Sequence, residues 1–547
     1  MLSHYLKNLS LDLLELFHFL KHKFNQNNFY YYALLVVIGF LLYLKSLSFN
    51  FTYLDDNELI LNNLPYLQNI GNVFDAFTKD AFYTLHSGAA YYRPLLTVSF
   101  ILEASLFGST PFVFHLTNVL LHLLTALLVF KLIDKLGCSK KTSLLLSLFF
   151  LVHPALTQAV SWVPGRNDSL LAIFVLSSFI FFLKFLETKK ASAYFFSIFF
   201  FALGLFTKET ALILPALMLF YLWQNYLLKK SIFIKFAIGW GVSALLWAPL
   251  RHIALSNPIP MGIKDGIISL FKNSPATLQL LGKTFFPFNL SVLPNIPDTT
   301  FLWGIGAIFL ILFFVFWRTR NMSDKDNKSY LIIFGLFWFV LFLLPSFIRP
   351  DPNIIADFIE HRLYLPIIGL IFLLSQSPFF IYSKKSWSKW FTLAWILILM
   401  VFTFINWNHQ NNFADKFSFW KNAAENSPHS PLAQKNLGAM YYLDKNYLLA
   451  EEYYKKSLAL NELEPMVHSN LGLIYAGRGD TQNAEKEYQR ELSFNPNYDN
   501  AHFNLGLLYY NQQKFTEAKI EWEKTLQINP DYADAKNALG VLSNLKK

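Results

Sequence analysis

Long apolar segments recur through the first 407 residues, and they restrict the fold more than any other feature of the sequence. A helix needs about 20 mostly apolar residues to cross the hydrocarbon core of a bilayer. Helices are favoured there because each one satisfies its own backbone hydrogen bonds where water is excluded. We therefore predict an all-α polytopic membrane domain over residues 1–407. Its expected spans number about eleven and are 29–49, 112–131, 142–162, 169–186, 191–207, 209–228, 232–250, 301–317, 330–348, 363–382 and 388–406, with 266–296 holding a re-entrant or additional pair.

The charged residues indicate how this domain lies in the membrane. Residues 1–407 carry 31 Lys and Arg against 19 Asp and Glu, whereas residues 408–547 carry 15 against 17. The basic residues of the first part gather in alternate connecting segments, such as 131–141, 184–190 and 318–328. Basic segments of this kind mark the cytoplasmic side of membrane proteins. This predicts a cytoplasmic N-terminus and an extracytoplasmic C-terminal domain, and it gives no reason to expect a nucleic-acid partner.

The cellular compartment is indicated less directly by the sequence. Cys138 is the single cysteine, so the chain has neither an intramolecular disulfide nor a two-cysteine metal site to identify a compartment. Short connecting segments and an Asn-, Lys- and Phe-rich composition favour a bacterial inner membrane with the C-terminal domain in the periplasm. An endoplasmic reticulum membrane with a luminal domain has the same topology and stays open.

The C-terminal part, residues 408–547, contains a repeat with a period of 34 residues. Small residues, aromatic residues and leucines each recur at this spacing, which is typical of stacked helical pairs. One such pair cannot bury its own apolar face, so neighbouring pairs must stack. We predict units at about 431–464, 465–498 and 499–532 with flanking half-repeats. The repeated positions are Gly438, Gly472, Gly506 and Gly540; Ala450, Ala484 and Ala518; and Tyr454, Tyr488 and Trp522.

These units resemble tetratricopeptide (TPR) repeats in their period and in the motifs NLGAMYY, NLGLIYA and NLGLLYY. A TPR array commonly uses its curved surface to bind an extended peptide or another protein. We therefore expect a protein or peptide partner. A passive stalk, or a contact within a complex, is the alternative.

An acidic pair, Asp55 and Asp56, follows the first expected span directly. Adjacent carboxylates repel each other, which favours a proton or a cation between them. The pair therefore suits a general base, a divalent metal site, or both. The alternative is an acidic residue at a helix N-terminus.

Further ionisable residues, together with the polar Gln158, lie at the ends of expected spans on the same predicted outer side. Such groups are costly near a membrane and are candidates for a functional site. Together they suit an anionic lipid head group and an acid–base reaction. Two of these residues also have simpler explanations. Arg93 can extend to the lipid head groups, and Lys208 can form a local ion pair with Glu209. The candidates are Arg93; His153, Gln158, Arg166 and Asp168; Lys208 and Glu209; and Glu360, His361 and Arg362.

The ordered set of motifs resembles the C-type glycosyltransferase superfamily, and more closely the transmembrane-and-TPR protein O-mannosyltransferases and their bacterial relatives. The resemblance rests on YLDDNELI, YYRPLLTVSF, HPALTQAVSWVPGRNDSLL, TKETALILPAL and EHRLYLP, followed by the repeats. It implies an inverting transfer of a sugar from a polyprenyl-phosphate donor to an acceptor on the outer face. The acceptor is expected to be a protein Ser or Thr.

The resemblance also implies roles for individual residues. Asp55 or Asp56 would act as the base, and Arg166, Lys208, Arg362 and Arg93 would bind the donor phosphate. His153, Gln158, Asp168, Glu209, Glu360 and His361 would support the site, and any divalent metal would lie at the Asp pair. The family commonly has Glu where this chain has Gln158, which leaves its donor or metal use open.

Two other functions remain to be weighed. A non-catalytic membrane anchor for a TPR scaffold would not need about eleven spans or the outer ionisable residues. A transporter for a lipid-linked sugar would place ionisable groups in the middle of its spans, whereas here they crowd at the outer ends. The glycosyltransferase is therefore the favoured prediction. The identity of the sugar and of the acceptor does not follow from the sequence.

Overall fold

The computed structural model describes residues 28–85, 91–255, 262–321, 330–348, 358–377, 380 and 388–545, and the regular elements in these ranges are helices. The predicted all-α class is confirmed. The predicted cytoplasmic N-terminus lies outside the described residues.

The chain divides into two compact units. The membrane unit comprises Met1–Leu290, Thr300–Pro352 and Ile359–Ala414, and the repeat unit comprises Ser291–Thr299, Asn353–Phe358 and Asp415–Lys547. The predicted boundary after residue 407 therefore comes too early. Helix α18 (Ser388–His409) continues past it into η11 (Gln410–Phe413). The amide of Gln410 donates to the carbonyl of Leu42, which ties this end to the first span.

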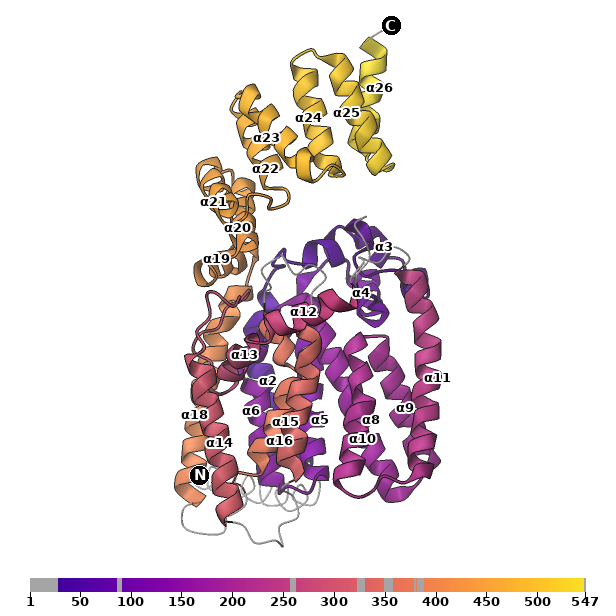
Figure 1. Cartoon of the computed structure of the whole chain (residues 1–547), viewed down its shortest axis with the longest axis vertical. Coiled ribbons are helices and arrows are strands. Elements are labelled where there is room, and N and C mark those ends of the chain that lie inside the picture. The colour runs from indigo at the N-terminus through magenta and orange to yellow at the C-terminus, as the bar shows by residue number, and fades with distance from the viewer. Residues whose placement is uncertain are drawn as a thin grey trace, which may run out of the picture. The chain divides into compact units, whose positions relative to one another are not determined.

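The membrane unit is built from long apolar helices that run side by side (Figure 1). Among the described residues, six helices are long and apolar enough to cross a membrane, and a seventh span counts if the bent pair Lys140–Val152 and Pro154–Ser161 is one. Five shorter apolar helices accompany them. Each of the eleven predicted segments coincides with one of these helices. The main ones are α2 (Phe29–Tyr43), α5 (Pro111–Lys135), α6 (Lys140–Val152), α8 (Arg166–Thr188), α9 (Ala191–Leu205), α10 (Leu214–Gln224), α11 (Lys230–Ala254), α14 (Leu302–Asn321), α15 (Tyr330–Leu343) and α16 (Pro366–Ser375).

Shorter elements gather at one end of this unit, where α3 (Leu64–Leu67), α4 (Pro94–Phe107) and α12 (Ile263–Asn273) lie (Figure 1). The first connecting segment packs in a small apolar core, to which Phe51, Leu59, Ile60 and Phe100 belong, together with Phe114 and Val163 from outside it. The region expected to hold a re-entrant or additional pair contains α12 and α13 (Ala276–Phe285). These helices have 11 and 10 residues, too few to cross a bilayer as an additional spanning pair, and a re-entrant pair stays a prediction.

The repeat unit contains the helical pairs that the 34-residue period predicts. After α19 (Lys416–Asn426), the pairs are α20 with α21 (Pro431–Leu443, Tyr447–Leu460), α22 with α23 (Val467–Gly477, Thr481–Phe494) and α24 with α25 (Asp499–Asn511, Phe515–Ile528), followed by α26 (Ala533–Leu545). A Cβ atom at Gly472 would lie 2.6 Å from the ring of Tyr488. The glycines therefore let each pair approach closely, as the sequence predicted.

The repeat unit also includes a segment from far earlier in the chain. The backbone N–H of Val292 donates to Asn422 over 3.2 Å, and the Ser427 hydroxyl donates to the carbonyl of Leu293 over 2.7 Å. Asp298 accepts from the backbone N–H of His429 over 3.0 Å. Residues 291–299 are thus joined to the first half-repeat, an arrangement that the periodic pattern does not reveal.

Candidate active site and repeat groove

The acidic pair lies at the start of the first connecting segment, just before η2 (Asn57–Leu61). Asp56 is fully buried, and its Oδ2 accepts from both the backbone N–H of Thr52, over 3.1 Å, and the Thr52 hydroxyl, over 2.5 Å. Burial raises the pKa of Asp56, while the contacts with Thr52 oppose this rise. Asp55 is only half-buried. The two carboxylates therefore have different surroundings, which the sequence alone could not show.

The turn that joins α6 to α8 brings the second predicted group into place. It bends through 54° after Val152 and continues as α7 (Thr157–Ser161). The amide of Asn118 on α5 donates to the carbonyls of Val160, Trp162 and Val163 and holds the turn. A Cβ at Gly165 would lie 2.7 Å from the carbonyl oxygen of Gln158, so the two sides of the turn meet closely.

This turn places Trp162 beside the acidic pair. Its neighbour Val163 packs in the same apolar core as Leu59 and Ile60, which follow Asp56 in the chain. Burial has the largest effect on the pKa of Asp56 and raises it. The Trp162 indole N–H is close enough to the Asp56 carboxylate to oppose this rise as a hydrogen-bond donor. The Trp162 ring also lies 5.4 Å from the ring of His361.

Beyond Trp162 lies a cluster of charged groups around Asp168. Lys208 Nζ donates to Asp168 Oδ1 over 2.8 Å, and His361 Nε2 lies 3.5 Å from Asp168 Oδ2. Arg93 and Arg362 lie close enough to influence the same groups electrostatically. Burial lowers the pKa of His361 to about 3 despite Asp168, so His361 is neutral at neutral pH. The structure thus brings together three of the four predicted phosphate ligands.

Glu360 belongs to a second buried cluster. Lys283 Nζ on α13 donates to Glu360 Oε1 over 2.7 Å, and His409 Nε2 on α18 lies 3.3 Å from Oε2. Burial favours a higher pKa for Glu360, but Lys283 and His409 outweigh it and hold the pKa below its ordinary value. His153 lies nearby and its Nε2 contacts the carbonyl of Thr284 over 2.9 Å. Lys283 and His409 were not predicted as site residues.

Arg166 does not join the phosphate cluster, and the prediction that it binds phosphate needs correction. Its side chain is fully buried, and it pairs with Glu103 over 2.7 Å. It also donates to Asn118, Ser99 and the carbonyl of Phe114. Four of its five N–H donors are thus used within the protein, and they fix α4 and α5 to the start of α8. Glu103, an acidic residue within an apolar helix, is a signal that could have identified this partner.

The two remaining predicted residues have less defined roles. Gln158 is fully buried in α7. Glu209 begins η8 (Glu209–Ile213), and no ion pair links it to Lys208 within the described residues. Among the residues that the structure describes, no three His, Cys, Asp or Glu side chains are grouped to hold a metal. A divalent metal at Asp55 and Asp56 stays a prediction.

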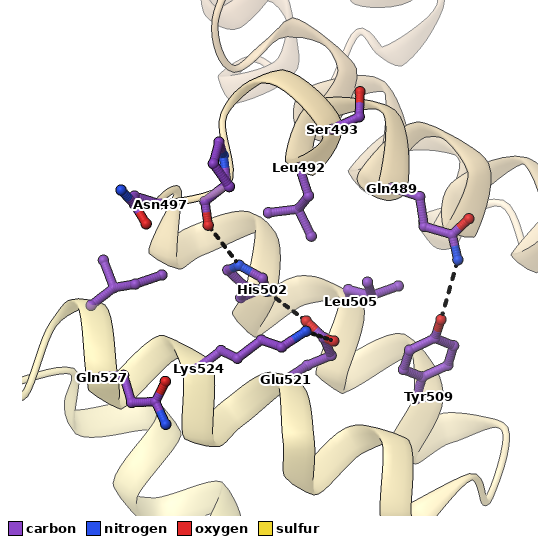
Figure 2. Close-up of a pocket in the computed structure, with 12 residues that line it drawn as sticks. Gln489, Leu492, Ser493, Asn497, His502, Leu505, Tyr509, Glu521, Lys524 and Gln527 are labelled. Carbon is purple, nitrogen blue, oxygen red and sulfur yellow. Dashed lines mark hydrogen bonds and ion pairs between the residues drawn. The ribbon is translucent and has the colours of Figure 1, made fainter.

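The repeat unit has a groove of about 550 Å³ between α23, α24 and α25 (Figure 2). His502 lies at its base, where Nδ1 contacts Glu521 over 2.5 Å and Nε2 contacts the carbonyl of Pro496 over 3.0 Å. Lys524 also contacts Glu521, over 2.8 Å. Uncharged polar side chains line the rest of the groove together with Leu492, Leu505 and Ile528; they are Gln489, Ser493, Asn497, Tyr509 and Gln527.

In the preceding repeat, an ion pair spans the surface equivalent to this groove. Arg490 and Glu462 occupy the positions equivalent to Lys524 and Pro496, 34 residues earlier. Arg490 donates to Glu462 over 2.6 Å and so bridges the equivalent surface. Pro496 has no carboxylate, and Lys524 turns to Glu521 instead.

Comparison with known families agrees with both units. The family model described as dolichyl-phosphate-mannose-protein mannosyltransferase matches residues 94–250. Tetratricopeptide repeat models match residues 445–502 and 499–532. The first match includes Arg166, Asp168 and Lys208 and ends before Glu360.

Several curated proteins are similar to this chain. Protein O-mannosyl-transferase TMTC2 of Mus musculus is 35% identical over 159 residues, which are 28% of this chain and 19% of that protein. The Xenopus laevis tmtc2 protein is 38% identical over 156 residues, 28% of this chain and 18% of that protein. Protein O-mannosyl-transferase TMTC3 of Mus musculus is 24% identical over 482 residues, 80% of this chain and 51% of that protein. The matched regions thus span about half of these relatives or less.

Proposed function

Because this chain shares a mannosyltransferase-type membrane segment and a TPR array with protein O-mannosyl-transferases, we propose that it is a membrane glycosyltransferase that modifies proteins. The donor is a sugar on a polyprenyl-phosphate carrier, and the acceptor is a Ser or Thr hydroxyl. The observation that carries this proposal is the set of neighbouring groups that connects Asp56, Trp162, His361, Asp168 and Lys208. It joins the acidic pair, one of whose carboxylates would be the base, to the cations around Asp168.

The proposed reaction is a single displacement. The acceptor oxygen forms a bond to the anomeric carbon of the sugar while the bond from that carbon to the phosphate oxygen breaks. A carboxylate of the acidic pair takes the hydroxyl proton, and the polyprenyl phosphate leaves with one additional negative charge. Because the attacking and leaving oxygens lie on opposite faces of the carbon, the configuration inverts.

Asp55 is our first choice for the base. Thr52 already donates two hydrogen bonds to one oxygen of Asp56, which suits that residue to holding the loop in place. Asp55 is the more exposed carboxylate and can approach an acceptor hydroxyl more readily. A positioned base of this kind typically contributes about 10²- to 10⁴-fold to the rate.

The leaving phosphate is assigned to Lys208, Arg93 and Arg362. Cations aimed at developing negative charge are among the largest contributions to catalysis. Asp168 holds Lys208 in place through their 2.8 Å contact. His361 lies beside the same carboxylate and is neutral, so it adds no further charge to the proposed phosphate site.

The repeat unit is proposed to hold the polypeptide acceptor or a protein partner. The groove beside His502 suits this role, because its uncharged amides can bond to an extended backbone (Figure 2). The membrane unit ends at Ala414, whose carbonyl accepts from the backbone N–H of Asn50 over 2.8 Å, near the acidic pair. The chain therefore leaves the membrane unit near the acidic pair. We propose, from the charge of the connecting segments, that this is the extracytoplasmic side of a bacterial inner membrane. Deleting residues 431–547 should impair acceptor choice more than donor binding.

The test is sugar transfer by the full chain in lipid, from polyprenyl-phosphate sugars into periplasmic or membrane proteins. Asp55→Asn and Asp56→Asn should each lower transfer strongly, and the double variant should abolish it. Glu187→Gln is the matched control, since Glu187 pairs with Lys135 at the ends of α5 and α8, away from the acidic pair. Unchanged transfer by the double variant would refute the proposal. If the repeats alone restored a deletion strain, a non-catalytic scaffold would be the better account.

A further inference from the structure

An apolar groove of about 680 Å³ lies on the membrane unit, between α10, α11 and α15. The ring of Phe220 on α10 forms part of its wall, 4.1 Å from the ring of Phe337 on α15 and 5.7 Å from that of Trp223. Helix α11 contributes Phe233 and Lys230, and Lys230 is the one polar residue among those that line the groove.

The groove is open because α11 packs toward α9 at its start. The Tyr194 hydroxyl on α9 donates to the carbonyl of Lys235 over 2.9 Å, and a Cβ atom at Gly239 would lie 2.6 Å from the side chain of Ile198. Trp223 stays 63% exposed and Phe233 43% exposed. The described residues therefore leave these two aromatic rings uncovered.

In a membrane this groove faces hydrocarbon. Helix α11 is long and apolar enough to cross the bilayer, and α10 and α15 are apolar along their length. Water is excluded at that depth, so an apolar groove there takes an apolar occupant. Lipid chains are the apolar molecules that surround the protein at that depth.

Two lysines stand where the head group of such a lipid would be. Lys229 and Lys230 are exposed and lie at the start of α11, the end of a helix that can cross the membrane. The sequence has neither Asp nor Glu between Glu209 and Asp265. Within the described ranges, no carboxylate forms an ion pair with either lysine. Their charge is therefore available to a lipid phosphate.

This end of α11 is remote from the candidate active site. The other end of the helix, at Ala254 and Leu255, packs in one apolar cluster with Tyr92 and Phe206, which are neighbours of Arg93 and Lys208 in the chain. Helix α11 runs the length of the membrane unit, and its 25 residues extend about 37 Å (Figure 1). The cations assigned to the donor phosphate are thus at the opposite end from Lys229 and Lys230.

We propose that the groove binds an acyl chain of an anionic phospholipid, whose phosphate contacts Lys229 and Lys230. The apolar walls hold the chain, and the two lysines select a head group with net negative charge. The bound lipid fills the space between α11 and α15 and belongs to the leaflet opposite the candidate active site. It is therefore a second lipid site, distinct from that of the donor.

The experiment is photo-crosslinking of the full chain in lipid nanodiscs. Two probes carry the same acyl chains, with a diazirine on one of them, and differ only in the head group: phosphatidylglycerol is anionic and phosphatidylcholine has no net charge. Mass spectrometry of peptides locates the adducts. The test variant is Lys229→Gln with Lys230→Gln. Its matched control is Lys140→Gln with Lys141→Gln, since these two exposed lysines begin α6 and do not line the groove.

Phosphatidylglycerol should label α10 and the start of α11 roughly 10- to 30-fold more than phosphatidylcholine, because each lysine near the membrane surface attracts an anionic lipid. The test variant should lose this preference, and the control should keep it. Ala216→Phe, which narrows the groove at an exposed position of α10, should lower labelling by both probes.

Equal labelling by the two probes, or a test variant that is labelled like the wild type, would overturn the inference. Labelling by neither probe would mean that something other than a phospholipid fills the groove. Displacement of phosphatidylglycerol by polyprenyl phosphate would assign the groove to the donor and would also overturn the inference. None of these measurements requires sugar transfer, so the proposed function and this site can fail separately.

Discussion

Lys283 and Glu360 form a buried ion pair of 2.7 Å, although 77 positions of sequence separate them. The side chain of Glu360 is fully buried and that of Lys283 is 4% exposed. His409 approaches the other carboxylate oxygen from α18. Three helical elements that are remote in sequence therefore meet at one charge cluster beside the candidate site.

Breaking this cluster should destabilise the membrane unit. Lys283→Met leaves Glu360 as a buried charge without its main partner, which typically costs about 3–5 kcal/mol. We expect a clear fall in the thermal unfolding temperature of the full chain in detergent or lipid. The double variant Lys283→Met with Glu360→Gln should unfold at a higher temperature than Lys283→Met alone. A double variant no better than the single one would show that packing rather than charge holds α13.

Arg166 and Lys208 should differ in what their loss impairs. Arg166→Met removes the partner of buried Glu103 and should lower the unfolding temperature. Adding Glu103→Gln should recover part of that loss. The surviving Arg166→Met protein should bind polyprenyl phosphate with little change.

Lys208→Ala should show the opposite pattern, with a small effect on stability and weaker binding of polyprenyl phosphate. A hydrogen bond to a charged group contributes about 1.5–3 kcal/mol, which corresponds to roughly 10- to 100-fold in the binding constant. Measuring the inhibition constant of polyprenyl phosphate and the unfolding temperature for both variants tests this difference. An equal loss of polyprenyl-phosphate binding in both variants would mean that Arg166 also binds the phosphate.

The groove of the third repeat should close when Pro496 is replaced by Glu. This substitution recreates the pair that Glu462 and Arg490 form one repeat earlier, with Lys524 in the place of Arg490. We expect the KM for a polypeptide acceptor to rise and the KM for the lipid donor to stay unchanged. Pro496→Ala is the control, since it removes the proline without adding a carboxylate. Equal values for the two variants would mean that the groove does not hold the acceptor.

The stability of the repeat unit should depend on pH through His468. Burial favours a lower pKa for His468, but Glu487 at 2.6 Å and the carbonyl of Glu462 at 3.1 Å outweigh it, and the pKa is raised. A pKa above that of the unfolded chain stabilises the fold below the unfolded value, about 6.5, and this contribution is lost as the pH rises through the folded pKa. Hydrogen exchange in α22, corrected for the intrinsic rate, should therefore be slower at pH 5.5 than at pH 8. His468→Gln should remove most of this difference, and an unaltered difference would assign it to other groups.

Much of this architecture follows from local patterns in the sequence. The apolar segments predicted the helices of the membrane unit, because length and composition are local properties. The 34-residue period predicted the helical pairs, because each unit repeats the same contacts. Asp168, Lys208, His361 and Arg362 could be expected to meet, since each one ends or begins a helix on the same predicted side.

Other features depend on contacts that no local pattern encodes. The side chain of Arg166 turns toward Glu103 rather than toward Lys208, and its position at a helix start does not decide between those directions. Lys283 lies on a helix too short to be recognised as a span, so nothing marked it as a partner of Glu360. Trp162 was visible in the HPALTQAVSWVPGRND motif. Its place between two clusters required the bend after Val152.

The docking of residues 291–299 on the first half-repeat has a consequence for how the protein is made. Val292, Leu293 and Asp298 are synthesised at least 130 residues before Asn422, Ser427 and His429, with which they bond. Contacts between positions so far apart form late in folding, because a long loop must close first. The early segment therefore lacks its partners until α14, α15, α16 and α18 have been synthesised. The repeat unit therefore cannot be completed before the rest of the membrane unit has been made, which couples the maturation of the two units.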